Sequence, residues 1–91
     1  MTMTADKTYN GWTNYETWNV ALWLSNDEGT YNYVRGMAEE AGDEYRLGTM
    51  LEEYVDEMRP DLGASMFADL LGAALSEVRW IEIARTFISE D

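Results

Sequence analysis

The stretch GWTNYETWNVALWL, residues 11–24, decides the fold because it holds three of the four tryptophans of the chain. Large aromatic side chains bury more area than other residues, so this segment is expected to anchor the hydrophobic core. Thr13 followed by Glu16 has the spacing of a capping box, which satisfies the first backbone N–H groups of a helix. The pattern therefore predicts a helix that begins at Asn14. Its predicted buried face contains Tyr15, Trp18 and Leu22, widened by Val20, Trp23 and Leu24.

This aromatic segment has two interpretations. Large apolar residues are most often core residues, which favours a structural keystone with no chemistry of its own. The other interpretation is a partner surface that uses one or two tryptophans as anchors, because tryptophan is enriched among the residues that dominate binding energy.

Residues 11–26 also resemble the signature of a family of small, mostly uncharacterised proteins carried by phages, plasmids and their bacterial hosts. That signature reads close to GWTNYETWxVxLWLxN. A shorter similarity lies at residues 78–84, VRWIEIA, where those proteins often carry WxEIA after a hydrophobic and a polar residue. The family has no catalytic motif to carry over. The resemblance therefore implies a mobile-element context and no particular reaction.

The composition limits the possible functions. A chain of 91 residues allows one domain with one core. It has neither cysteine nor histidine, which removes thiolate nucleophiles, zinc–thiolate sites and the commonest general base. There is no signal-peptide pattern and no apolar run of membrane-spanning length. We therefore expect a soluble protein of the host cytoplasm, with no cofactor, no metal site and no catalytic residues.

The net charge of −12 comes from 18 acidic and 6 basic residues. Such a charge argues against direct binding to nucleic acid or to an anionic membrane, and it favours attraction to basic surfaces. Lys7 is the single lysine, the other cations being arginines. An acidic, lysine-poor surface also arises in adaptation to high salt, and composition alone leaves both explanations open.

The capping and turn residues along the chain predict an all-α fold of about five short helices around the aromatic first helix. Residues 1–10 are polar and lack periodicity, so they are predicted to be a flexible arm, followed by a single helical domain over residues 11–91. The first helix is expected to end near Ser25. Asp43 and Ser65 have the composition of N-caps. The later helices are predicted over residues 28 or 30 to 41, 44–58, 66–75 and 77–89, with Gly42 as a C-cap and Pro60 as a stop.

Each of these helices carries apolar residues at the helical period. Gly36 predicts a close approach of neighbouring backbone, and Gly48 a weak point after which Thr49 and Glu52 form a second capping-box pattern. The predicted inward residues are Tyr31, Val34, Met37, Ala38 and Ala41; Leu47, Leu51, Tyr54, Val55 and Met58; Met66, Phe67, Leu70, Leu71, Ala74 and Leu75; and Val78, Trp80 or Ile81, Ala84, Phe87 and Ile88.

The middle of the chain is strongly acidic, with nine acids and two bases between residues 39 and 61. In the third predicted helix, Glu52 with Asp56 and Glu53 with Glu57 are like-charge pairs that each cost a few tenths of a kcal/mol. Carboxylates one helical turn apart are separated by about 5–6 Å, close enough to imitate a row of nucleic-acid phosphates. The predicted partner-binding face consists of Glu39, Glu40, Asp43, Glu44, Glu52, Glu53, Asp56 and Glu57.

This acidic run has two other interpretations. The first is a solvated face, which is what a run of charges usually forms. The second is a magnesium or calcium site, for which no ligand spacing is diagnostic. Carboxylate catalysis needs an acid with a raised pKa in an apolar pocket. Glu16 is the one acid embedded among aromatics, and its capping role already explains it. Tyr33 points away from the stripe of the second predicted helix and is the best candidate for an aromatic anchor.

Together these observations predict a non-enzymatic protein of a mobile element. It would bind and inhibit a nucleic-acid-handling host defence protein, of restriction or CRISPR type, by presenting an acidic surface to its basic channel as a mimic of nucleic acid. The alternative is a phage or plasmid accessory or structural protein that self-associates through exposed aromatics. The sequence leaves open whether the protein is a monomer or a homodimer.

Overall fold

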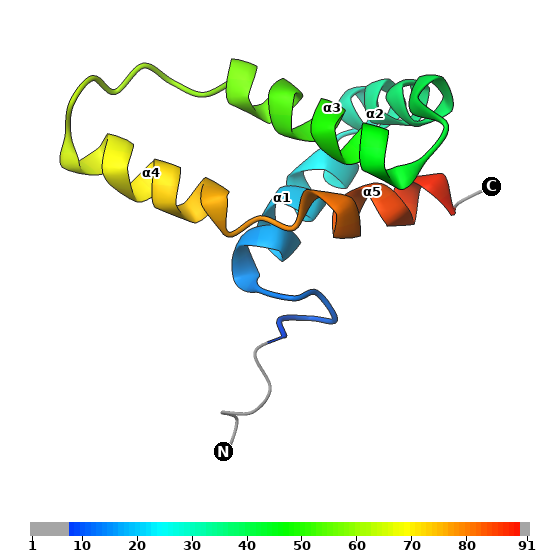
Figure 1. The fold of residues 1–91 in the computed structure, drawn as a ribbon, viewed down its shortest axis with the longest axis horizontal. Helices are drawn as coiled ribbons and strands as arrows, with labels where there is room; N and C mark the ends of the chain where they lie inside the picture. The colour runs from blue at the N-terminus through cyan, green and yellow to red at the C-terminus, as the bar shows by residue number, and fades with distance from the viewer. Residues whose placement is uncertain (1–7, 90–91) are drawn as a thin grey trace.

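The computed structural model describes residues 8–89, which form five α-helices and no β-strand (Figure 1). The all-α prediction is therefore confirmed. Most of the predicted N-terminal arm, residues 1–7, lies outside the described residues. No helix within residues 8–89 is long and apolar enough to span a bilayer. The helices are α1 (Tyr15–Asn26), α2 (Glu28–Ala41), α3 (Glu44–Glu57), α4 (Met66–Ser76) and α5 (Trp80–Ile88).

Side-chain caps begin four of the five helices, which explains most of their boundaries. The predicted caps Asp43 and Ser65 each accept the backbone N–H three residues further on. Asp27 does the same at the start of α2. Gly42 ends α2 with a φ of 81°, a left-handed conformation that glycine adopts without a steric penalty. α5 lacks such a cap and begins at Trp80, three residues later than predicted.

The predicted cap of the first helix was wrong by one residue. Asn14 is the N-cap, and its Oδ1 accepts the backbone N–H of Thr17 at 2.9 Å. The backbone N–H of Thr13 instead donates to the carboxylate of Glu82, 3.2 Å from Oε2. Because Thr13 is held by α5, α1 begins at Tyr15, and the capping box of Thr13 with Glu16 does not form.

The hydrophobic core lies where α2, α3 and α5 meet, and α3 packs most extensively against α5. Leu47, Leu51 and Ile83 are completely buried there. Gly48 permits this close packing, because a Cβ atom at Gly48 would lie 3.1 Å from Cγ1 of Ile81. The predicted weak point is thus a helix–helix contact, and the second capping box is wrong because α3 continues through it.

The aromatic first helix does not bury the face that its sequence predicted. Trp23 is 68% exposed, and Tyr15 and Leu22 are also exposed. Trp18 is half-buried and packs on the ring of Tyr9, with 4.8 Å between centroids. The residues that α1 buries are Thr17, Ala21 and Leu24. Leu24 is thus the one buried residue of the predicted face, and Trp12 and Val20 pack against the core. The keystone prediction is confirmed only in part, because Tyr15, Leu22 and Trp23 remain exposed.

Hydrogen bonds across the chain hold the start of α1 against the residues around the start of α5. Thr17 is fully buried, and its hydroxyl oxygen accepts the backbone N–H of Arg79 at 2.9 Å. The side-chain amide of Asn14 donates to the carbonyl oxygen of Glu77 at 2.8 Å. α1 is thus oriented by polar contacts as well as by apolar burial.

The apolar stripes of the other central helices are largely confirmed, with corrections at Met58 and Ile83, and a separate one at Gly36. All but Tyr31 of the predicted stripe of α2 are buried, and Tyr31 is half-buried. Met58 is exposed because α3 ends one residue earlier. Of the alternatives Trp80 and Ile81, Trp80 is half-buried against the core and Ile81 is exposed. Ile83, outside the predicted stripe, is completely buried. Gly36 meets nothing within 4 Å of its Cβ position, so the predicted close backbone approach there is wrong.

The fourth helix stands apart from the other four (yellow to orange in Figure 1), at the end of the long connection that follows α3. It contains no buried residue. Met66, Phe67 and Leu70 were predicted to point inward, yet they are 65%, 63% and 60% exposed. The prediction failed because this helix is apolar on nearly every side, so its periodicity does not single out the face that meets the core.

Candidate functional site

The four predicted acids in the second half of α3 lie on two different edges of that helix. Glu52 and Asp56 lie on one edge, lining a cavity of about 190 Å³ between α3 and α4. Asp56 there lies 3.5 Å from the guanidinium of Arg59. Glu53 and Glu57 are exposed and do not line either of the two cavities that Glu52 borders. Residues at i and i+4 share a helix edge, which explains why the four acids separate into these two pairs.

Two of the predicted acids serve the fold. Asp43 caps α3 by accepting the backbone N–H of Arg46 at 2.8 Å. Glu44 accepts two hydrogen bonds from Arg85, at 3.2 Å from Nε and 2.9 Å from Nη2, and so ties α3 to α5. The hydrogen bond from Arg85 lowers the pKa of Glu44 below its usual range, and the same bond raises the pKa of Arg85.

The remaining acids are exposed and lie near helix C-termini. Glu39 and Glu40 are in the last turn of α2, and Glu57 is the last residue of α3, one turn after Glu53. The ion pairs seen within residues 8–89 involve none of these four. We call these four acids the acidic edge; Glu39 and Glu40 lie where α2 turns into α3, and Glu57 lies at the far end of α3, about 20 Å from its start. A helix C-terminus carries a partial negative charge that favours cations, and neither α2 nor α3 has a basic residue in its last turn.

The predicted aromatic anchor lies beside this acidic edge. Tyr33 is exposed on α2, and its ring packs against that of Tyr54 on α3, with 5.1 Å between centroids. Tyr54 follows Glu53 directly and lies one helical turn before Glu57. An aromatic pair therefore lies near Glu53 and Glu57, an arrangement that the sequence did not reveal because the two tyrosines are on different helices.

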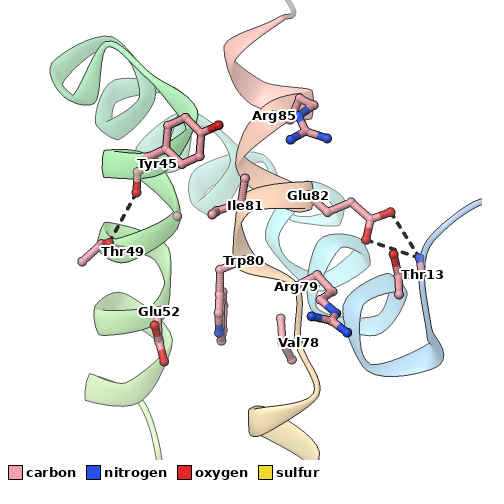
Figure 2. Close-up of a pocket in the computed structure, with 11 residues that line it drawn as sticks. Thr13, Tyr45, Thr49, Glu52, Val78, Arg79, Trp80, Ile81, Glu82 and Arg85 are labelled. Carbon is pink, nitrogen blue, oxygen red and sulfur yellow. Dashed lines mark hydrogen bonds between the residues drawn. The ribbon is translucent and has the colours of Figure 1, made fainter.

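An open groove of about 580 Å³ lies between α3, α5 and the segment before α1 (Figure 2). Glu52 and Tyr45 line it from α3, and Trp80 stands between the helices. Figure 2 also shows the backbone N–H of Thr13 joined to both carboxylate oxygens of Glu82.

This groove differs in charge from the acidic edge. Arg79 and Arg85 line it together with Glu82, so acids and bases alternate along its wall. Our sequence interpretation assigned no role to these residues. The one available signal was the short motif at residues 78–84, which contains Trp80 and Glu82. Within the part of the chain that the structure describes, no three carboxylates lie close enough together to hold a metal ion.

Comparison with known proteins gives a family and no function. No curated protein and no solved structure matches the chain. The match to the family DUF7249 extends over residues 5–90, and so includes both sequence motifs. The chain therefore belongs to DUF7249, a family of unknown function.

Proposed function

We propose that this protein is a non-enzymatic inhibitor carried by a phage or plasmid, which binds the basic nucleic-acid channel of a host defence protein of restriction or CRISPR type. The resemblance of residues 11–26 to phage- and plasmid-borne proteins supports the mobile-element setting. The observation that carries the proposal is the acidic edge: exposed carboxylates without ion-pair partners among the described residues, placed at the ends of α2 and α3.

The energetics of these positions support a binding role. An acid in the last turn of a helix is disfavoured by about 0.3–1 kcal/mol, and each like-charge pair one turn apart adds a few tenths of a kcal/mol. Glu57 has both disadvantages, since it lies at the end of α3 and one turn after Glu53. A basic surface that met these carboxylates would relieve the repulsion, so the arrangement suits a bound state better than the isolated protein.

The local geometry supports a protein channel that normally holds nucleic acid. Carboxylates about 5–6 Å apart along a helix edge approximate the spacing of phosphate charges. The neighbouring pair of Tyr33 and Tyr54 adds aromatic contact area, which supplies much of the binding energy in protein interfaces. Charge would then guide the encounter, and the tyrosines would anchor the complex.

The proposal can be tested in bacteria that carry defined restriction or CRISPR systems. Expression of the parent protein should restore plaque formation by a phage that the system otherwise blocks. A variant with Glu40→Gln, Glu53→Gln and Glu57→Gln should lose this protection, because its shape is kept and its charge is removed. The matched control, Asp69→Asn with Glu77→Gln and Glu28→Gln, removes three exposed acids elsewhere and should protect like the parent.

The purified target should show the same dependence. Double-stranded DNA should displace the parent protein from it, and the triple variant should bind about tenfold or more weakly at low salt, mainly through a slower association rate. A target that binds both proteins equally, or protection that survives in the triple variant, would contradict the acidic-edge mechanism.

A further inference from the structure

The exposed side of α4 is an apolar surface without an intramolecular partner. Met66, Phe67, Leu70, Ala73 and Ala74 follow one another along this side at the helical period. The first four are exposed and Ala74 is half-buried. We call these five residues the α4 stripe. A helix that is apolar all round is normally buried, and a helix of 11 residues is marginal on its own in water. We therefore expect a binding partner to cover the stripe.

The charged residues around the stripe limit the classes of partner that can bind it. Residues 60–78 contain three acids, Asp61, Asp69 and Glu77, and no base. Arg59, just before them, reaches α4 beside Gly72 and pairs with Asp56, so it offers no free cation at the stripe. Helices that lie on membranes carry lysine and arginine on their polar face, and nucleic acid requires the same cations. Both classes are disfavoured, which leaves an apolar protein surface.

The order of side chains in the stripe makes it complementary to itself. Its N-terminal half is large, with Met66 and Phe67, and its C-terminal half is small, with Ala73 and Ala74. Leu70 lies at the centre, three residues from Phe67 and from Ala73, and four from Met66 and from Ala74. When two such helices meet antiparallel, the large half of one faces the small half of the other, and this fit repeats on both sides of the symmetry axis.

We propose that the α4 stripe is the interface of a homodimer, in which α4 packs antiparallel against α4 of a second copy. The two-fold axis passes beside Leu70, so Leu70 meets the partner's Leu70. Phe67 packs on the partner's Ala73, and Met66 packs on the partner's Ala74. This proposal does not rest on the inhibitor function, because none of the acidic edge takes part.

The stripe can hold a second copy only weakly. The stripe contains no charged residue, so no like charges meet within it, but two chains that each carry a net charge of −12 repel one another over a longer range. Met58 and Leu62 are also exposed, on the connection into α4. Together these side chains offer roughly 400–500 Å² of exposed apolar surface, in the range that marks interaction sites on soluble proteins. That area is below the ~800 Å² per partner of a standard interface, so the dimer should dissociate on dilution.

The test is the mass measured by sedimentation equilibrium from about 1 μM to about 1 mM, a range that covers weak dimers. The mass of the parent should rise from 10.5 kDa towards twice that value. Leu70→Glu and Leu70→Lys should each weaken the dimer about 100-fold or more, because two like charges meet on the axis and two leucines lose their burial. An equal mixture of the two variants should associate again, because glutamate then faces lysine.

The control is Trp23→Glu, which places a charge on an exposed aromatic of α1 and should leave the dimer intact. Leu70 is exposed, so its variants should keep the helical circular dichroism of the parent. A parent that stays monomeric at about 1 mM, Leu70 variants that dimerise like the parent, or a mixture that fails to associate would each overturn the proposal. Binding of monomeric parent to phosphatidylcholine vesicles, lost in Leu70→Glu, would assign the stripe to lipid and overturn it as well.

Discussion

At the scale of single residues, the most informative side chain is Thr17. It is the one fully buried polar residue among residues 8–89, and it accepts the backbone N–H of Arg79, 62 positions away. The sequence identified the aromatic residues around Thr17 but not Thr17 itself. A hydrogen bond between residues so distant in the chain leaves no local pattern, so periodicity and capping rules cannot predict it.

Removing the Thr17 hydroxyl should leave the part-buried N–H of Arg79 without its acceptor. We expect Thr17→Val to destabilise the protein by about 1–3 kcal/mol, the usual cost of an unsatisfied buried donor. Thr17→Ser keeps the oxygen and loses only a methyl group, about 1 kcal/mol. Urea unfolding followed by tryptophan fluorescence would compare the two. Equal stability of Thr17→Val and the parent would show that this hydrogen bond contributes nothing.

The pair of Glu44 and Arg85 should make stability depend on pH. The pKa of Glu44 is lowered in the folded protein, chiefly by the hydrogen bond from Arg85, so the pair stabilises the fold above the unfolded pKa. This contribution is lost as the pH falls through the folded pKa. Between about pH 5 and pH 3 the parent should therefore lose stability more steeply than Glu44→Gln, and the two should converge in acid. Arg85→Gln, which breaks the pair from the other side, should resemble Glu44→Gln. Parallel curves for all three proteins would exclude this role of the pair.

At the scale of helices, the sequence predicted α2 and α3 well and α1 and α4 poorly, for one physical reason. α2 and α3 have polar residues opposite Val34 and Leu51, so one face is clearly apolar and becomes buried. α1 and α4 have large apolar residues on several faces, as Trp23 and Phe67 show. In such helices the helical period identifies the helix but not the side that meets the core, which depends on tertiary packing.

Gly36 within α2 and Gly42, the C-cap of α2, should respond in opposite ways to substitution by alanine. Gly36 lies within the helix with nothing near its Cβ position, so Gly36→Ala should stabilise the protein by about 0.5–1 kcal/mol through helix propensity. Gly42 has a φ of 81°, so Gly42→Ala should destabilise by about 1 kcal/mol. Thermal unfolding of both variants under one condition gives the comparison, and a destabilised Gly36→Ala would mean that this face of α2 is covered.

At the scale of the whole molecule, shape and charge dominate. The radius of gyration is 14.1 Å, against about 12 Å for a compact domain of this length, because α4 extends away from the core. The acidic character of the surface was predictable from composition. The division of α3 into two edges, the use of Glu44 by the fold and the pairing of Tyr33 with Tyr54 were not, since each depends on which helices become neighbours.

The net charge should make the fold more stable as salt is added. The 18 acids outnumber the 6 bases, so the chain repels itself. This net repulsion is screened when the Debye length shortens to about 10 Å at 0.1 M salt. The urea midpoint should therefore rise between about 0.01 M and about 0.2 M sodium chloride. The double variant Glu53→Gln, Glu57→Gln should be more stable at low salt and should gain less from added salt. A midpoint that falls with salt would mean that attractive ion pairs outweigh the repulsion.

The hydrogen bonds that join the start of α1 to Glu77, Arg79 and Glu82 also bear on how the chain folds as it is made. The groups that orient α1 are synthesised 62 to 69 residues after the residues that they contact. During translation, α1 therefore cannot take its native position until α5 has left the ribosome. We expect the exposed aromatic segment, with Trp18 and Trp23, to be accessible to chaperones until then.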